Sequence, residues 1–162
     1  MAYLKQLSWM VVLLLVACSG ELARAADPPS DLCSLLPSAM VSKTLGYAYS
    51  SPTKSVAPRP FRNTNEGTDC KYGSGALRLL LFRVYVDPSP TAATDLFARL
   101  SRFYGPQTPV NGVGDEAYFD GEHALHVRKG KVRFYLNLTP VDSASATEKQ
   151  LRDLASRVCG RL

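Results

Sequence analysis

The strongest strand signal in this 162-residue chain is the stretch Leu79-Leu80-Leu81-Phe82-Arg83-Val84-Tyr85-Val86. It is long, rich in β-forming residues and apolar on both of its alternating faces, which is typical of a strand in the middle of a sheet. The turn-forming sequence Asp-Pro-Ser-Pro follows at residues 87–90, and proline cannot continue a strand ladder. We therefore predict a central strand over residues 76–86.

The segments on either side of this strand predict an α+β fold. Helical periodicity and capping residues indicate helices over residues 38–45, 91–104 and from Ser143 or Ser145 to about 159, with one helical turn over residues 31–36. Shorter strands are predicted over residues 68–72, 116–119, 123–128 and 132–139, the last three as an antiparallel meander. Residues 50–67 and 105–114 are rich in turn-forming residues, so we predict mostly loops there. The predicted fold is a single α+β domain, in which an antiparallel β-sheet packs with three α-helices in the order α-β-β-α-β-β-β-α.

The first 25 residues have the layout of a bacterial export signal. Lys5 precedes an apolar run over residues 7–17, and small residues follow the run. The run is shorter than the about 20 apolar residues that a membrane-spanning helix needs. We therefore predict that the folded part of the chain works outside the cytoplasm.

Two cleavage sites follow the apolar run. One is a lipobox, Leu-Val-Ala-Cys at residues 15–18, with cleavage before Cys18 and attachment of lipid to this cysteine. The other is Ala-Arg-Ala at residues 23–25, with cleavage after Ala25. Residues 26–30 then form a tether and residues 31–162 the domain. Both sites predict a protein of the periplasm or cell envelope, anchored to the membrane by lipid in the first case and soluble in the second.

Composition and motifs disfavour several classes of protein. The net charge is +5 at pH 7, but Lys and Arg are spread along the chain without a run, so nucleic acid is not an expected partner. Gly112-Val113-Gly114 lacks the strand before it and the helix after it that a phosphate-binding loop needs. The cysteine spacings do not resemble a zinc site. We expect no cofactor and no metal.

Three cysteines remain after either cleavage, and two of them should pair in an oxidising compartment. We predict a disulfide between Cys33 and Cys70, which would tie the first helix to the first long strand. A closed loop of about 37 residues contributes about 3–4 kcal/mol in the chain-entropy model. Cys159 is then left over, either as a buried inert thiol or as a reactive or intermolecular cysteine.

Several charged and aromatic residues are predicted to share the sheet face opposite the core. Successive side chains of a strand point to opposite faces, and the apolar set of each predicted strand marks the core side. The residues on the other side are Arg83, Tyr85, His126, Arg128, Arg133 and Tyr135. Arginine and tyrosine are favoured at recognition surfaces, so we predict that these residues form a basic, aromatic ligand-binding surface on an open sheet face. The alternative is a solvated sheet face without a ligand.

An acidic cluster and two histidines suggest a second kind of site. Paired carboxylates support acid–base chemistry, and four of them surround the predicted strand 116–119. They are Asp115, Glu116, Asp120 and Glu122. On a strand, His123 points inward and His126 outward, so the two do not share a metal. The cluster is therefore either a solvated strand edge or, together with His126, part of a small hydrolase.

Five short motifs occur in an order that resembles a known family. They are Cys33-Ser34-Leu35-Leu36, Leu45-Gly46, Cys70-Lys71-Tyr72, Pro-Val-Asn-Gly-Val-Gly-Asp-Glu-Ala-Tyr at residues 109–118 and Leu-His-Val-Arg-Lys-Gly at residues 125–130. Over about residues 31–162 they resemble bacterial cell-envelope lipoproteins of unknown function, best known from actinobacteria. That family is similar to the extracytoplasmic sensor domain of a mycobacterial membrane kinase.

This resemblance implies an α+β sandwich, a Cys33–Cys70 disulfide and a binding rather than a catalytic role, and it brings no catalytic residues. Cys159 departs from the usual two-cysteine pattern of the family. The expected function is that of an exported, lipid-anchored, non-catalytic binding or accessory domain. Its ligand is an envelope component or a partner protein. The alternatives are an envelope hydrolase that uses Asp115, Glu116 and Asp120, and a purely structural lipoprotein.

Overall fold

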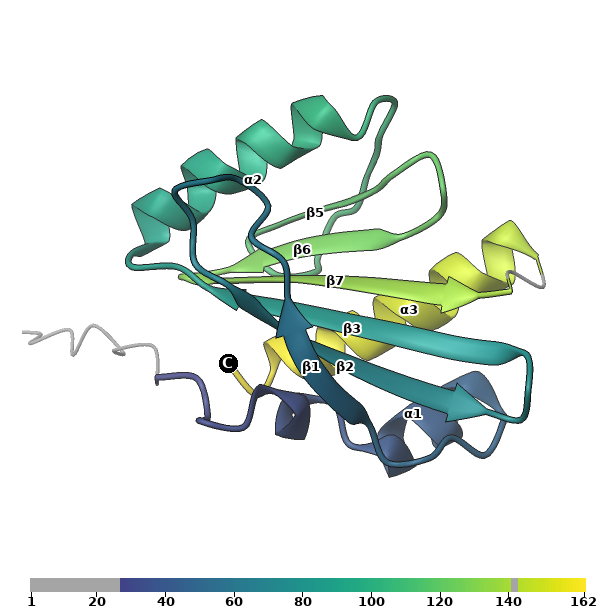
Figure 1. The fold of residues 1–162 in the computed structure, drawn as a ribbon. Coiled ribbons are helices and arrows are strands. Elements are labelled where there is room, and N and C mark those ends of the chain that lie inside the picture. The colour runs from purple at the N-terminus through teal and green to yellow at the C-terminus, as the bar shows by residue number, and fades with distance from the viewer. Residues whose placement is uncertain (1–26, 141–142) are drawn as a thin grey trace, which may run out of the picture.

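Seven strands form one antiparallel sheet in the part of the chain that the structure, a computed structural model, describes: residues 27–140 and 143–162 (Figure 1). Their order across the sheet is β1-β2-β3-β7-β6-β5-β4. The strands are β1 Thr53–Ala57, β2 Gly67–Ser74, β3 Arg78–Val86, β4 Thr108–Pro109, β5 Glu116–Phe119, β6 Leu125–Lys129 and β7 Val132–Thr139. β3 pairs with β2 on one side and β7 on the other, so the strand predicted to be central lies inside the sheet.

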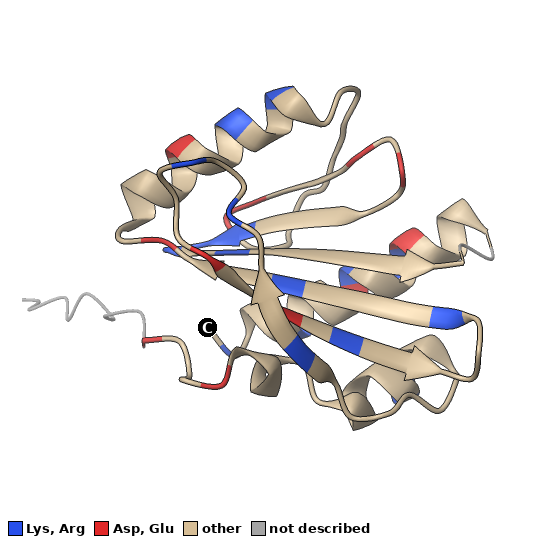
Figure 2. Cartoon of the chain, viewed as in Figure 1, with Lys and Arg blue, Asp and Glu red and all other residues tan. Residues whose placement is uncertain are grey.

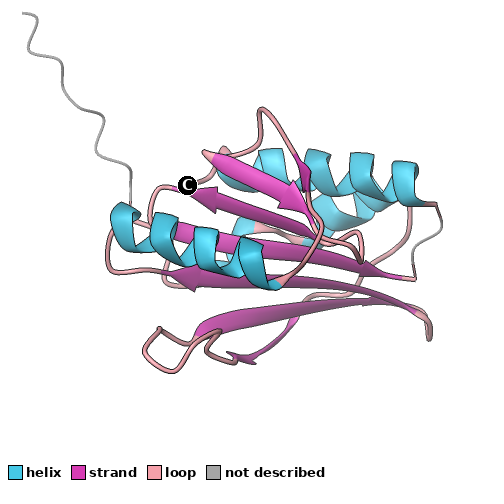
Figure 3. Ribbon diagram, turned by 90° about the horizontal axis from the view of Figure 1, so that it is seen from above, coloured by secondary structure: helices cyan, strands magenta, loops and turns pink. Residues whose placement is uncertain are grey.

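Helices cover both faces of this sheet (Figures 1 and 3). They are the 3-10 turn η1 Leu32–Leu35 and the α-helices α1 Ser38–Leu45, α2 Pro90–Phe103 and α3 Ala144–Cys159. α1 and α3 lie on one face, and the large apolar side chains of the core are buried between them and the sheet. α2 lies on the other face, against β6 and β7. The predicted single α+β domain with three α-helices is confirmed.

Local sequence explains where the two long helices begin. The hydroxyl of Ser89 accepts the N–H of Ala92 at 3.1 Å, and Pro90 opens α2, where its missing N–H costs no intrahelical bond. The hydroxyl of Ser143 accepts the N–H of Ala146 at 3.3 Å at the start of α3, so Ser143 is the cap. Phe103, the last residue of α2, is 77% exposed, so the buried stripe of Ala93, Phe97 and Leu100 ends before the helix does.

Two short strands lie in segments predicted as loops. β1 pairs with β2 from Thr53 opposite Lys71 to Ala57 opposite Gly67. Four of its five residues are exposed, and no alternation of apolar and polar residues marks it in the sequence. β4 is only two residues long and pairs with β5. Both are edge strands that are held by their neighbour, and this is why periodicity misses them.

The sequence predicts His123 on a strand, but it lies in the turn that precedes β6. The Asp120 carboxylate accepts the N–H groups of Glu122 and Ala124, each at 3.0 Å, and so closes a tight turn. His123 has a φ of 62° within this turn, and β6 begins only at Leu125. The His123 ring lies on the side of α3, where its Nδ1 is 3.3 Å from Glu148, and the side chain is 42% exposed.

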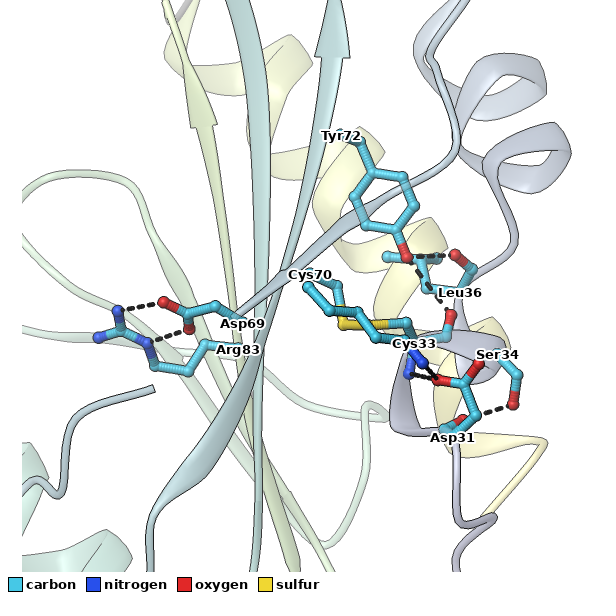
Figure 4. Close-up of a disulfide and its surroundings, with 9 residues drawn as sticks. Asp31, Cys33, Ser34, Leu36, Asp69, Cys70, Tyr72 and Arg83 are labelled. Atoms are coloured by element: carbon cyan, nitrogen blue, oxygen red, sulfur yellow. Dashed lines mark hydrogen bonds and ion pairs between the residues drawn. A yellow bond between two sulfur atoms is a disulfide. The ribbon is translucent and has the colours of Figure 1, made fainter. Parts of the chain in front are cut away.

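The predicted disulfide between Cys33 and Cys70 is present and joins η1 to β2 (Figure 4). Both cysteines are buried, with a Cα–Cα distance of 5.7 Å. Beside them the Tyr72 hydroxyl donates to the carbonyl oxygen of Leu36 at 2.5 Å, and the Asp31 carboxylate accepts the N–H of Cys33 at 3.0 Å. The disulfide and these bonds hold the N-terminal segment against the sheet.

Cys159 lies at the end of α3 as a free, partly buried thiol. Burial raises the pKa of this thiol to about 11. The thiolate, which is the reactive form, is therefore scarce at neutral pH. This favours the inert thiol over the reactive cysteine among the two alternatives.

The predicted export signal, with its sites at Cys18 and Ala25, lies outside the described residues. Within residues 27–140 and 143–162, no helix combines the length and the apolar composition that crossing a membrane requires.

We predict that the double variant Cys33→Ala/Cys70→Ala loses about 3–4 kcal/mol of unfolding free energy. The 37-residue separation between the cysteines restricts the unfolded chain, and this restriction is lost with the bond. Urea denaturation followed by circular dichroism measures the change. Cys159→Ser is the control and should shift the midpoint little. A double variant as stable as the wild type would contradict the prediction.

Candidate functional site

The residues predicted for the sheet face lie in two neighbouring rows across the strands. The first row runs Asp69, Arg83, Tyr135, His126, Tyr118, and the second runs Tyr85, Arg133, Arg128, Glu116. Each residue is the register partner of the next, so all of these side chains point to one face of the sheet. The six residues predicted to share the face opposite the main core therefore do lie on one face of the sheet.

This face is not the open surface that the sequence predicts, because α2 covers part of it. The ring of Phe97 lies 5.1 Å from that of Tyr118, and Tyr104, which follows α2, lies 4.7 Å from the ring of His126. As a result His126 is 5% and Arg133 3% exposed. The apolar stripe of α2 needs a surface to pack on, and the aromatic rings of this face supply one.

The two arginines of the site are neutralised by carboxylates, so the predicted basic surface is corrected. Nε and Nη2 of Arg83 donate to the two oxygens of Asp69 at 2.6 and 2.9 Å (Figure 4). Nε and Nη2 of Arg133 donate to Asp87 at 2.5 and 3.0 Å, and both of these side chains are almost fully buried. Such bidentate pairs satisfy charge and hydrogen bonding together. Across the described chain, Lys and Arg lie interspersed with Asp and Glu (Figure 2).

His126 is enclosed by aromatic rings and one carboxylate. Its ring stacks on Tyr118 with centroids 4.7 Å apart and an interplanar angle of 10°, and the Tyr135 centroid lies at 4.9 Å. Nε2 of His126 lies 2.8 Å from Oδ2 of Asp120. Burial opposes the charged form of Asp120, but its hydrogen bonds with His126 and Ala124 outweigh this and lower its pKa. The pair therefore carries an ionised carboxylate at neutral pH.

A cavity of about 70 Å³ lies between α2, the sheet and the β1–β2 loop. It is lined by Pro60, Arg83, Tyr85, Phe97, Leu100, Tyr104, His126, Arg133, Phe134 and Tyr135. Five of the six residues predicted from the sequence are in this set. Tyr104 is 41% exposed and the Arg83 side chain 26%, whereas Tyr85 and Arg133 are buried. Arg83 and Tyr104 therefore form the mouth, and Tyr85 and Arg133 the floor.

The β1–β2 loop is held over this cavity by a few polar contacts. The Tyr85 hydroxyl donates to the Pro58 carbonyl at 2.8 Å, and Nδ2 of Asn65 donates to the Val86 carbonyl at 3.0 Å. The Arg99 guanidinium of α2 lies 4.1 Å from the centre of the Phe61 ring. Burial raises the pKa of Tyr85, so its hydroxyl stays protonated and able to donate.

Arg128 lies in the same row but outside the cavity. Its guanidinium donates to Glu116 at 2.9 Å and to Asp115 at 3.0 Å, and Asp115 also accepts the N–H of Gly130 at 2.7 Å. Burial opposes the charged form of Asp115, but these hydrogen bonds and the nearby Lys129 lower its pKa. Arg128 thus joins strand ends through its ion pairs and does not line the cavity.

The predicted acidic cluster is divided between two places. Asp115 and Glu116 hold Arg128, whereas Asp120 closes its turn and contacts His126. Nδ1 of His123 lies 3.3 Å from Glu148 of α3, away from this pair. No group of three or more His, Cys, Asp or Glu side chains that could hold a metal occurs in the described residues.

Sequence reasoning missed the residues that close the cavity. Pro60 comes from a segment predicted as a loop, and Phe97 and Leu100 belong to the helix predicted over residues 91–104, whose packing partner the sequence does not identify. Two wider surface hollows, of about 620 and 290 Å³, lie beside loops, and neither contains any of the six predicted residues. The cavity under α2 is therefore the candidate site.

The buried pair of Arg133 and Asp87 gives a stability prediction. Asp87→Asn leaves the guanidinium buried without its counter-charge, so the unfolding free energy should fall by about 3–5 kcal/mol. Urea denaturation measures the loss. Asp153→Asn is the matched control, because its partner Lys149 has a side chain that is 78% exposed, and such pairs contribute at most about 1 kcal/mol. Equal effects of the two variants would contradict the prediction.

Comparison with models of known protein families finds no match to this chain, and a search of curated proteins finds none either.

Proposed function

We propose that the chain is an exported, lipid-anchored, non-catalytic binding domain of the bacterial cell envelope, and that the cavity under α2 is its binding site. One observation carries the proposal: a cavity of about 70 Å³ is lined by paired arginine, histidine and tyrosine side chains. Such a mixture of aromatic walls and a few convergent polar groups is typical of ligand sites.

Stability alone does not account for these polar groups. Replacing a buried ion pair by apolar residues of similar volume is often neutral or stabilising. The side chains of Arg133 and Asp87 are 3% and 1% exposed, so this ion pair occupies interior space that apolar side chains usually fill. Beside them a cavity is left open, although well-packed interiors contain few voids. A role in recognising a ligand explains both features.

Export and anchoring are supported by different observations. The disulfide between Cys33 and Cys70 is compatible with an oxidising compartment outside the cytoplasm. The apolar run ends directly at Cys18, which favours cleavage there and attachment of lipid. The residues that surround the cavity all belong to the domain after residue 31, so anchoring leaves the site free to face the envelope.

A second candidate function is a small hydrolase, favoured by the contact of 2.8 Å between His126 and Asp120. A histidine held by a carboxylate is a common general base. Against this, the cavity lining in the described residues holds no Ser, Thr, Cys or Lys that would act as a nucleophile. A hydrolase at this site would have to activate a water molecule as the nucleophile, whereas a binding site needs no nucleophile.

The state of the N-terminus tests the anchoring. In a bacterial host we expect a mature protein that starts at Cys18, carries diacylglycerol on that cysteine and sediments with membranes. Mass spectrometry of the purified protein measures this. Cys18→Ser should still be exported and released by cleavage after Ala25. A wild-type protein that starts at free Ala26 would contradict lipid anchoring and leave export intact.

Binding is tested with a muramidase digest of bacterial peptidoglycan added to the ¹⁵N-labelled mature protein. We expect amide shift changes to cluster on β3, β6 and β7 around the cavity. Tyr104→Ala should weaken the apparent affinity at least tenfold because it removes the mouth of the site. Tyr47→Ala is the matched control, since Tyr47 is 44% exposed and lies outside the cavity lining.

Two results would decide against this proposal. Shift changes that are absent, or that avoid the cavity, would show that the site does not bind this material. New reducing ends or freed peptides produced by the wild type, and lost in His126→Gln, would favour the hydrolase.

A further inference from the structure

The size of the cavity limits what enters it. A cavity of about 150 Å³ holds benzene, which has six non-hydrogen atoms. The cavity under α2 measures about 70 Å³, so about three non-hydrogen atoms fit. It is therefore a subsite for one small group of a larger ligand, and the rest of that ligand must lie outside the mouth.

The charge balance indicates that this group is uncharged. Asp69 and Asp87 each bind one guanidinium through both oxygens. An entering carboxylate or phosphate would have to displace one of these carboxylates, and a cation would meet guanidinium groups on the wall. In a low-dielectric pocket, either costs more than placing a neutral group there.

The polar atoms that remain are hydrogen-bond donors. A guanidinium has five N–H groups, and the bidentate pairs use Nε and Nη2. The Nη1 groups of Arg83 and Arg133 donate to no other residue in the described part of the chain. The Tyr118 hydroxyl, which is outside the cavity lining, is buried and has no hydrogen-bond partner among the described residues. A group that enters the cavity should therefore bring an acceptor, such as a carbonyl oxygen.

The opposite wall is apolar. Phe97 and Leu100 of α2 and Pro60 of the β1–β2 loop line it. A group with a carbonyl oxygen on one side and a methyl on the other matches both walls, and a flat group fits between the sheet and the helix. An acetamido group has these properties and carries no charge, and the three non-hydrogen atoms of its acetyl part fit the volume of the cavity.

The mouth of the cavity suggests what carries the acetamido group. Tyr104 is 41% exposed and its ring forms an edge contact with that of Phe103, with centroids 5.7 Å apart. The C–H face of a pyranose ring stacks on such an exposed aromatic ring. Arg83, whose side chain is 26% exposed, lies at the mouth and offers hydrogen bonds to hydroxyl groups.

We propose that the cavity takes the N-acetyl group of an uncharged amino sugar, with the sugar ring lying across Tyr104. This inference rests on the proposed function, since it names the ligand class of the same site. In this arrangement the charge-balanced arginines donate hydrogen bonds to the carbonyl oxygen of the acetyl group. The apolar side chains of α2 contact its methyl group.

The test is calorimetric titration of the mature protein with three trisaccharides. N,N′,N″-triacetylchitotriose should bind, and cellotriose, which has hydroxyls in place of the acetamido groups, should bind at least tenfold more weakly. The deacetylated glucosamine trimer, which is cationic, should also bind at least tenfold more weakly. Leu100→Phe, which fills the cavity, and Tyr104→Ala, which removes the platform, should each weaken binding of the acetylated trimer about tenfold, whereas Tyr47→Ala should not.

The outcomes separate this inference from the proposed function. If the peptidoglycan digest shifts the cavity amides but the three trisaccharides bind alike or not at all, the acetamido assignment is wrong and the binding site stands. If an N-acetyl-lysine peptide binds as tightly as the acetylated trimer and is equally sensitive to Leu100→Phe, the sugar assignment is overturned. If Leu100→Phe does not fold, Tyr104→Ala decides, because an exposed residue at a helix end tolerates truncation.

Discussion

The antiparallel register between β3 and β7 is the constraint on which the candidate site depends. It places Arg83 opposite Tyr135 and Tyr85 opposite Arg133, so that each strand brings one cation and one aromatic ring to the same face. Because side chains alternate along a strand, a slip by one residue would exchange this face with the apolar core face. The aliphatic residues that must be buried against α1 and α3 thus also hold the polar cluster in place on the other side.

Packing of α2 turns this polar face into a second, smaller interior. Arg133 tolerates that burial because Asp87, directly after β3, accepts two hydrogen bonds from it, and the carbonyl of Lys131 in turn holds the Asp87 N–H at 2.8 Å. His126 tolerates it because Asp120 comes from the turn that leads into its own strand. Each of the two arginines is matched by a carboxylate, so neither guanidinium carries an uncompensated charge before any ligand arrives.

Part of this arrangement could be predicted from the sequence, and the physical reason is the period of two. Alternation in β7 separates Arg133 and Tyr135 from Phe134, and the same rule applied to β3 and β6 selects the remaining residues of the face. Alternation does not reveal which element covers a sheet face. The amphipathic pattern of α2 indicates that the helix packs on a surface, but it does not identify that surface. The pairing of Asp87 with Arg133 spans 46 residues and depends on the register, which a single sequence does not reveal.

The small size of the site connects its chemistry to the proposed anchor. Ligand efficiency rarely exceeds about 1.5 kcal/mol per non-hydrogen atom, so a group of about three atoms contributes at most about 4.5 kcal/mol, which corresponds to a Kd of about 0.5 mM at best. A protein that diffuses freely would hold such a ligand briefly. A lipid at Cys18 confines many copies to a surface, and a polymer with repeated acetamido groups then meets several sites at once. Under these conditions weak individual contacts add through effective concentration, so a neutral, shallow subsite suits an anchored protein better than a soluble one.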